Sequence, residues 1–108
     1  PIMFNSSIET KISSKSTIDS QYLKKLKNIC NDPVMVYGKS GKRFEKQIFS
    51  LSYKKHSLHN FSLFMKVEGG LPIRRFIEGG DVSPNISDIL NCKCTCEEFD
   101  FHDIEVWS

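Results

Sequence analysis

Two segments near the middle of the chain alternate apolar and polar residues, and this pattern constrains the fold more than any other feature. In 47–53 (QIFSLSY) the residues predicted to share one face are Phe49, Leu51 and Tyr53. In 61–67 (FSLFMKV) they are Phe61, Leu63, Met65 and Val67. Successive side chains of a strand point to opposite faces, so each segment predicts a strand with one buried face. The polar stretch 54–60 between them predicts a hairpin turn, and therefore antiparallel pairing.

Helical patterns lie on both sides of this hairpin. Residues 16–31 carry an apolar stripe at helical spacing, formed by Ile18, Tyr22, Leu23, Leu26, Ile29 and Cys30. Ser16 or Thr17 is the expected N-cap, with Asp19 in the first turn, where the helix dipole favours a carboxylate. Pro33 ends this helix.

Two shorter helices are predicted in the second half of the chain. Residues 71–78 (LPIRRFIE) form the first, with Pro72 tolerated in its first turn and Gly79 and Gly80 ending it. In the second, Ser83 is the expected N-cap, Pro84 takes the first position, and Ile86, Ile89 and Leu90 face inward.

Three further strands complete the expected order. They are 2–12, the buried-type segment 34–37, and 92–106. In the last of these, one face carries Cys92, Cys94 and Cys96 and the other carries Phe99 and Phe101, so a bulge near 97–99 is expected. The order β-α-β-β-β-α-α-β predicts an α+β fold, a mostly antiparallel sheet with helices on one side. At 108 residues, 1–108 is expected to be a single domain.

Charge is distributed unevenly along the chain. Residues 1–56 carry 11 Lys or Arg against 4 Asp or Glu, whereas residues 57–108 carry 4 against 9. A basic half of this kind suits a polyanion, although a lysine-rich solvated surface gives the same pattern. No apolar run is long enough to span a membrane, and no signal-like start is visible, so we expect a cytoplasmic protein without a membrane partner. The sequence starts at Pro1 rather than Met, as expected of a processed product or a piece of a longer protein.

Several kinds of active site are disfavoured. The four cysteines are too few and too unevenly spaced for a disulfide scaffold, so a reducing compartment is expected. A C-x-C-x-C strand does not bring thiols round one ion as C-x₂-C turns do, so we expect no metal and treat these cysteines as small core residues. His56, His59 and His102 show no catalytic pattern, and no nucleotide-binding glycine motif is present, so no cofactor is expected.

The loop 38–43 (GKSGKR) is the strongest candidate for contact with nucleic acid. Lys39, Lys42 and Arg43 are suited to touching phosphates without reading sequence. Tyr37 and Phe44 flank the loop and are interpreted first as buried core aromatics, with base stacking as the alternative.

The segment 67–81 (VEGGLPIRRFIEGGD) holds four of the six glycines around the adjacent Arg74 and Arg75. One interpretation is two ordinary turns flanking a short helix with surface arginines. The other is that Gly69 and Gly70 let the backbone turn sharply into a helix that positions Arg74.

The stretch from Lys66 to Val106 resembles the C-terminal end of the archaeal and eukaryotic tRNA pseudouridine synthases that modify the TΨC loop. The matching positions are Gly69, Gly70, Leu71, Ile73, Arg74, Gly80, Asp81, Pro84, Ser87 and Leu90, with Phe99-Asp100-Phe101 similar in type. The segment 40–44 (SGKRF) stands where the family has a basic Thr-Pro-Arg-Arg-Val stretch.

The resemblance implies a role for Arg74. In these synthases the corresponding basic residue pairs with the catalytic aspartate, and an arginine fork holds a carboxylate ionised and oriented. It also implies tRNA as partner, with backbone contacts from Lys39, Lys42, Arg43, Lys46 and Arg75. The sequence departs from the family in two ways: Pro72 replaces the usual aromatic, and no Gly-Arg-x-Asp segment supplies the aspartate. We therefore expect a C-terminal piece, a split subunit or a non-catalytic relative that does not isomerise uridine alone and works with a missing N-terminal portion or partner subunit.

Two other functions fit the same sequence. The chain is alternatively a non-catalytic module that uses its basic half on RNA or on a protein. It is alternatively a subunit whose acidic half docks onto a basic partner.

Overall fold

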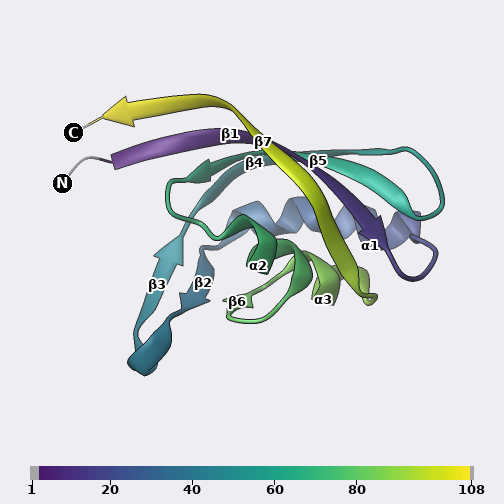
Figure 1. The fold of residues 1–108 in the computed structure, drawn as a ribbon, viewed down its shortest axis with the longest axis horizontal. Helices are drawn as coiled ribbons and strands as arrows, with labels where there is room; N and C mark the ends of the chain where they lie inside the picture. The colour runs from purple at the N-terminus through teal and green to yellow at the C-terminus, as the bar shows by residue number, and fades with distance from the viewer. Residues whose placement is uncertain (1–2, 108) are drawn as a thin grey trace.

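The structure is a computed structural model that describes residues 3–107, with side chains described for residues 4–102. Figure 1 shows a curved sheet above a layer of short helices, with a hairpin projecting to one side. The elements in chain order are β1 (Met3–Ser14), α1 (Ser20–Lys25), η1 (Leu26–Asn31), β2 (Val34–Tyr37), η2 (Lys39–Gly41), β3 (Arg43–Lys46), β4 (Ile48–Lys55), β5 (Asn60–Glu68), α2 (Ile73–Glu78), β6 (Val82–Ser83), α3 (Ile86–Leu90) and β7 (Cys94–Trp107). The predicted α+β class and the order of its main elements are confirmed; Ile2 of the first predicted strand lies outside the described residues.

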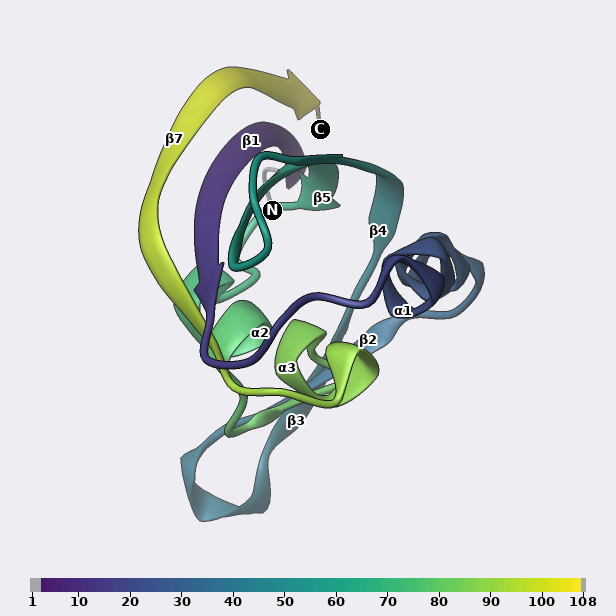
Figure 2. The ribbon, with the colours of Figure 1, turned by 90° about the vertical axis from the view of Figure 1, so that its right-hand side faces the viewer.

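The larger sheet is antiparallel throughout, in the order β4-β5-β1-β7. Its β4–β5 hairpin is the one predicted from the alternating segments. Its concave face packs against the helices, as Figure 2 shows from the end of the sheet. The pairs Ile8↔Met65 and Ile12↔Phe61 point into the core, and all four side chains are almost fully buried.

A second sheet of three strands, in the order β3-β2-β6, lies beside the helices. β3 and β6 were not predicted as strands. β3 lacks a buried face, because Arg43, Phe44 and Glu45 are all exposed. β6 has only two residues, and the Tyr37 N–H extends its pairing by donating to the carbonyl of Asp81 (2.7 Å).

Both predicted helix N-caps were displaced along the chain. Asp19, not Ser16 or Thr17, caps α1, and its carboxylate accepts from the N–H of Gln21 (2.8 Å). The predicted long helix is one α-helical segment followed by the 3-10 segment η1. Ser83 belongs to β6, whereas Asn85 caps α3 by accepting from the N–H of Asp88 (2.8 Å).

Phe49 of β4 was predicted to face the core, and this prediction was wrong. A register shift lies between Ile48 and Ser50, so Ile48 enters the core and Phe49 is 47% exposed. Leu51 is buried, as predicted. The extra residue changes the phase of the alternation, a change that the pattern of residue types does not reveal.

β7 carries two irregularities of the same kind. Lys11 pairs with Glu98 but Ile12 pairs with Cys96, so Glu97 is an extra residue, in the range where a bulge was predicted. His102 is extra in the same way, because Ser7 pairs with Asp103 and Ile8 pairs with Phe101. Cys94 and Cys96 are buried, as expected of core residues, but Cys92 precedes the strand and is only half-buried.

Candidate nucleic-acid interface

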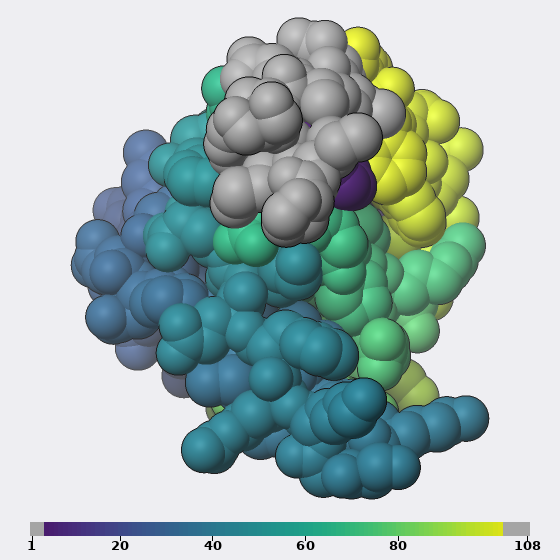
Figure 3. All heavy atoms as spheres, turned by 90° about the vertical axis from the view of Figure 1, so that its left-hand side faces the viewer, coloured from purple at the N-terminus to yellow at the C-terminus, as the bar shows by residue number. Residues whose placement is uncertain are grey.

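The predicted basic loop forms the tip of a hairpin made by β2, η2 and β3. Its strands pair in register at Tyr37↔Arg43 and Val36↔Phe44, and the Gly38 N–H closes the tip on the carbonyl of Lys42 (2.6 Å). Gly41 has a φ of +77°, a left-handed conformation that glycine adopts without steric cost. The hairpin projects from the domain, as its atoms show at the bottom of Figure 3.

Three cations of this hairpin are available to a ligand. Lys39, Lys42 and Arg43 are exposed. Within residues 3–107, their side chains take part in no ion pair or hydrogen bond. Extended cationic side chains of this kind bind phosphates as point charges or as a fork.

Lys46, at the base of the hairpin, is placed differently. Its ammonium donates to the carbonyl of Gly69 (2.9 Å) and lies 3.5 Å from the Glu68 carboxylate. About a quarter of its side chain is exposed, at 23%. Lys46 therefore ties β3 to the turn that follows β5.

The two aromatic residues of the hairpin are on the surface. Tyr37 is 45% exposed and Phe44 is 51% exposed, so their interpretation as buried core aromatics was wrong. Phe44 lies on the edge strand β3 and Tyr37 lies at the end of β2, where the hairpin projects and leaves both rings partly uncovered. Exposed aromatic faces beside cations are what single-stranded nucleic acid requires for stacking.

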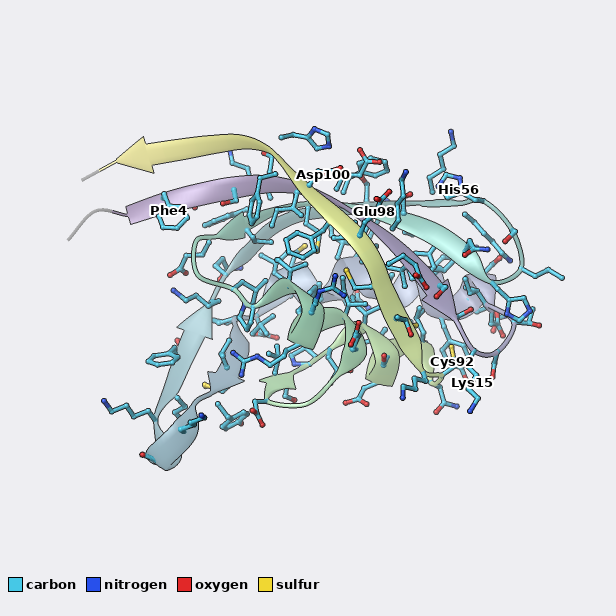
Figure 4. The ribbon with its side chains drawn as sticks, in the orientation of Figure 1. Phe4, Lys15, His56, Cys92, Glu98 and Asp100 are labelled. Carbon is cyan, nitrogen blue, oxygen red and sulfur yellow. The ribbon has the colours of Figure 1, made fainter. Side chains whose placement is uncertain are left out.

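The paired glycines form the turn between β5 and α2. The Gly69 N–H donates to the carbonyl of Phe4 (2.8 Å), and a Cβ on Gly69 would lie 2.2 Å from the Phe4 ring. Gly70 has a φ of +91°, a conformation that other residues rarely adopt. Figure 4 shows Phe4 near the start of β1, on the side of the sheet that carries the helices.

Arg74 leaves the first turn of α2 and is anchored on β7. Its Nη1 donates to the carbonyl of Cys96 (2.8 Å) and lies 3.8 Å from the Glu78 carboxylate. Its guanidinium carbon stands 5.9 Å from the centre of the Phe99 ring. The side chain is still 58% exposed, so much of the guanidinium faces solvent.

Arg75, the next residue, points elsewhere. Its Nη1 lies 3.5 Å from the Asp81 carboxylate, and about half of its side chain is exposed. The predicted site residues thus fall into two groups, the projecting hairpin and the start of α2. Lys46 links them through Gly69.

Sequence reasoning missed Glu78 and Phe99 as neighbours of Arg74. Glu78 follows Arg74 by one helical turn, and i,i+4 pairs of opposite charge on a predicted helix are a recognisable signal. Phe99 had no such signal, because its position depends on the bulge at Glu97.

The cysteines are arranged as core residues. Burial raises the pKa of Cys94 to about 12, and burial also raises the pKa of Cys96, against the opposing effect of Arg74. Within the described residues, no three His, Cys, Asp or Glu side chains gather closely enough to hold a metal ion. No helix in the described part of the chain has the length and apolar character needed to cross a membrane.

The described residues form a small α+β fold with a cationic hairpin and an arginine anchored at a sheet edge. The chain is 58% identical over 106 residues to the tRNA pseudouridine synthase Pus10 of Nitrosopumilus maritimus, covering 98% of this chain and 28% of that protein. It is 36% identical over 106 residues to the protein of the same name from Cenarchaeum symbiosum, covering 98% of this chain and 26% of the relative. A third relative of this name, from Pyrobaculum arsenaticum, is 29% identical over 59% of the chain and 16% of its own length.

These relatives support the tRNA pseudouridine synthase resemblance and extend it over almost the whole chain. The chain spans little more than a quarter of the length of the first two, at 28% and 26%. No protein-family model matches the chain.

Proposed function

We propose that this chain is the C-terminal portion of a tRNA pseudouridine synthase, which converts uridine to pseudouridine in the TΨC loop. The observation that carries the proposal is the 58% identity to a tRNA pseudouridine synthase over 98% of the chain. No Gly-Arg-x-Asp segment occurs in this sequence, so the catalytic aspartate is supplied from outside it.

Arg74 is the residue proposed to act at the active site. Among the residues whose side chains are described, its hydrogen bond and ion pair both involve Nη1, and its side chain is 58% exposed. A guanidinium has five N–H donors, so a fork remains for a carboxylate. Paired in this way, the aspartate stays ionised and fixed in direction.

The hairpin is proposed to hold the tRNA backbone. Lys39, Lys42 and Arg43 are free to meet phosphates, while Tyr37 and Phe44 offer faces for an unpaired base. Arg75 is a further candidate, with one edge against Asp81. Lys46 is expected to contribute less, because its ammonium is already held by Gly69 and Glu68.

The catalytic proposal is tested in a chimera in which this chain replaces the matching segment of the N. maritimus protein. Pseudouridine formation and tRNA affinity are measured for the parent chimera, Arg74→Ala and Arg75→Ala. We expect Arg74→Ala to abolish turnover while tRNA binding survives, and Arg75→Ala to keep turnover. A folded, tRNA-binding parent chimera without activity would contradict the proposal, as would Arg74→Ala that loses binding and retains chemistry.

The hairpin proposal is tested by the salt dependence of tRNA binding. Lys42→Ala is expected to lower the slope of log affinity against log salt by about one. Lys46→Ala is expected to change it less, and the exposed Lys24 of α1 provides a matched control. Equal slopes for Lys42→Ala and Lys24→Ala would show that the hairpin does not touch phosphates.

A further inference from the structure

We propose that Glu78 is a positioning residue for Arg74, and this proposal rests on the proposed function. Both side chains project from α2, one helical turn apart, toward the backbone of Cys96 in β7. Together they fix the direction of the guanidinium before any carboxylate from outside the chain arrives.

The contacts form a closed ring. Arg74 Nη1 donates to the Cys96 carbonyl (2.8 Å), and the Cys96 N–H donates to Glu78 Oε2 (3.0 Å). The ring closes between Arg74 Nη1 and Glu78 Oε2, which are 3.8 Å apart. Thus the carbonyl and the N–H of Cys96 both bind side chains of α2.

The two backbone hydrogen bonds set the geometry more than the ion pair does. An exposed pair at 3.8 Å contributes little by itself, and Glu78 is 37% exposed. A hydrogen bond from a backbone N–H to a carboxylate is stronger and more directional. Glu78 therefore pins α2 to β7 at Cys96, which holds the Arg74 backbone at the distance its own bond to Cys96 requires.

This arrangement leaves one side of Arg74 for chemistry. Nη1 is occupied by the chain itself, and the Phe99 ring lies 5.9 Å from the guanidinium carbon. The remaining donors face solvent from a guanidinium whose orientation is fixed. A preoriented donor avoids the cost of ordering a long side chain during the reaction.

The first measurement uses the purified chain and follows amide hydrogen exchange at Cys96. Glu78→Ala removes the acceptor, so we expect exchange at Cys96 to accelerate by roughly tenfold or more. Glu78→Gln keeps an acceptor oxygen and is expected to leave exchange nearly unchanged. Asp81→Ala is the matched control, because it removes the carboxylate beside Arg75 without touching Arg74. Equal exchange at Cys96 in Glu78→Ala and Asp81→Ala would overturn the proposal.

The second measurement uses the chimera and separates the single-turnover rate from tRNA affinity. We expect Glu78→Ala to lower the rate by about tenfold with unchanged affinity, and Glu78→Gln to restore most of it. A rate in Glu78→Ala equal to that of Asp81→Ala, with Arg74→Ala inactive, would refute the positioning role alone. Full turnover in Arg74→Ala would instead refute the proposed function, while the Cys96 exchange result would still report on the contact.

Discussion

Replacing Gly69 by alanine tests whether the absence of a Cβ at this position allows β1 to pack closely against the turn between β5 and α2. The new Cβ would lie 2.2, 2.3 and 2.5 Å from three carbons of the Phe4 ring. Comfortable carbon contacts begin at ~3.5 Å, so the ring has to move by about 1.3 Å. The backbone is held in place as well, because the Gly69 N–H donates to the Phe4 carbonyl.

The expected cost follows from what the ring can do. Overpacking of this kind destabilises by about 1–3 kcal/mol, and Phe4 is 37% exposed, so it has solvent to swing into. We therefore expect Gly69→Ala to lower the free energy of unfolding by about 1–2 kcal/mol. For a domain of this size that is a fall in Tm of roughly 4–8 °C.

The assay is urea unfolding of the purified chain, followed by circular dichroism, for Gly69→Ala, Phe4→Ala and the double variant. Without the Phe4 ring the clash is gone, so Gly69→Ala should be nearly neutral in that background. Gly70→Ala is the matched control: its cost comes from a φ of +91° and should be the same with or without the ring. An equal cost of Gly69→Ala in both backgrounds would refute the argument from close approach.

Two further predictions concern other buried contacts. Asn85→Ala is expected to destabilise by about 1–3 kcal/mol in urea unfolding, because buried Asn85 accepts from the Asp88 N–H and donates to the Val82 carbonyl (3.1 Å); a loss no larger than that of a surface Asn→Ala change would contradict this. The ordinary pKa of a cysteine thiol is 9.0, but burial raises the pKa of Cys94 to about 12 in the folded chain. Between these values the thiol ionises in the unfolded chain and not in the folded chain, so the free energy of unfolding is at its full value below pH 9.0 and falls as pH rises toward about 12. Cys94→Ala should therefore flatten the decline measured across that range. Parallel pH profiles for the two proteins would show that Cys94 does not titrate in this way.

The parts of the fold that could be predicted are those with a local cause. The β4–β5 hairpin followed from alternation within each strand, and α2 followed from a short apolar pattern ended by Gly79. In both cases the residues that determine the element lie within it or next to it.

The prediction errors arose where the structure of a segment depends on its pairing with residues distant in the sequence. Phe49 was placed inward because the register shift against β5 cannot be read from β4 alone. β3 was missed because Arg43, Phe44 and Glu45 are exposed and the strand exists only through its pairing with β2. Serine is a residue type common at helix N-caps, but Ser83 pairs with Met35 and therefore belongs to a strand.

The candidate site was predictable in part. Arg74 and the cations of 39–43 could be identified from residue types and from the family resemblance. Whether each cation is exposed or held by a neighbouring group could not be predicted from the sequence. Lys46 has the same side chain as Lys42, yet one ammonium is held by Gly69 and the other is exposed. That difference depends on where the turn after β5 lies relative to β3.

The two extra residues of β7 decide which of its side chains lie on the same face of the sheet. Between Cys96 and Phe99, and again between Phe101 and Asp103, one inserted residue resets which face the following side chains take. Because of the extra residue Glu97, Cys96 and Phe99 share a face: they pair with Ile12 and Thr10, which lie on one face of β1, whereas unbroken alternation would place them on opposite faces. A regular strand of the same length would turn Phe99 away from the face on which it meets Arg74. The bulge at Glu97 therefore decides the surroundings of the arginine as directly as the identity of Phe99 does.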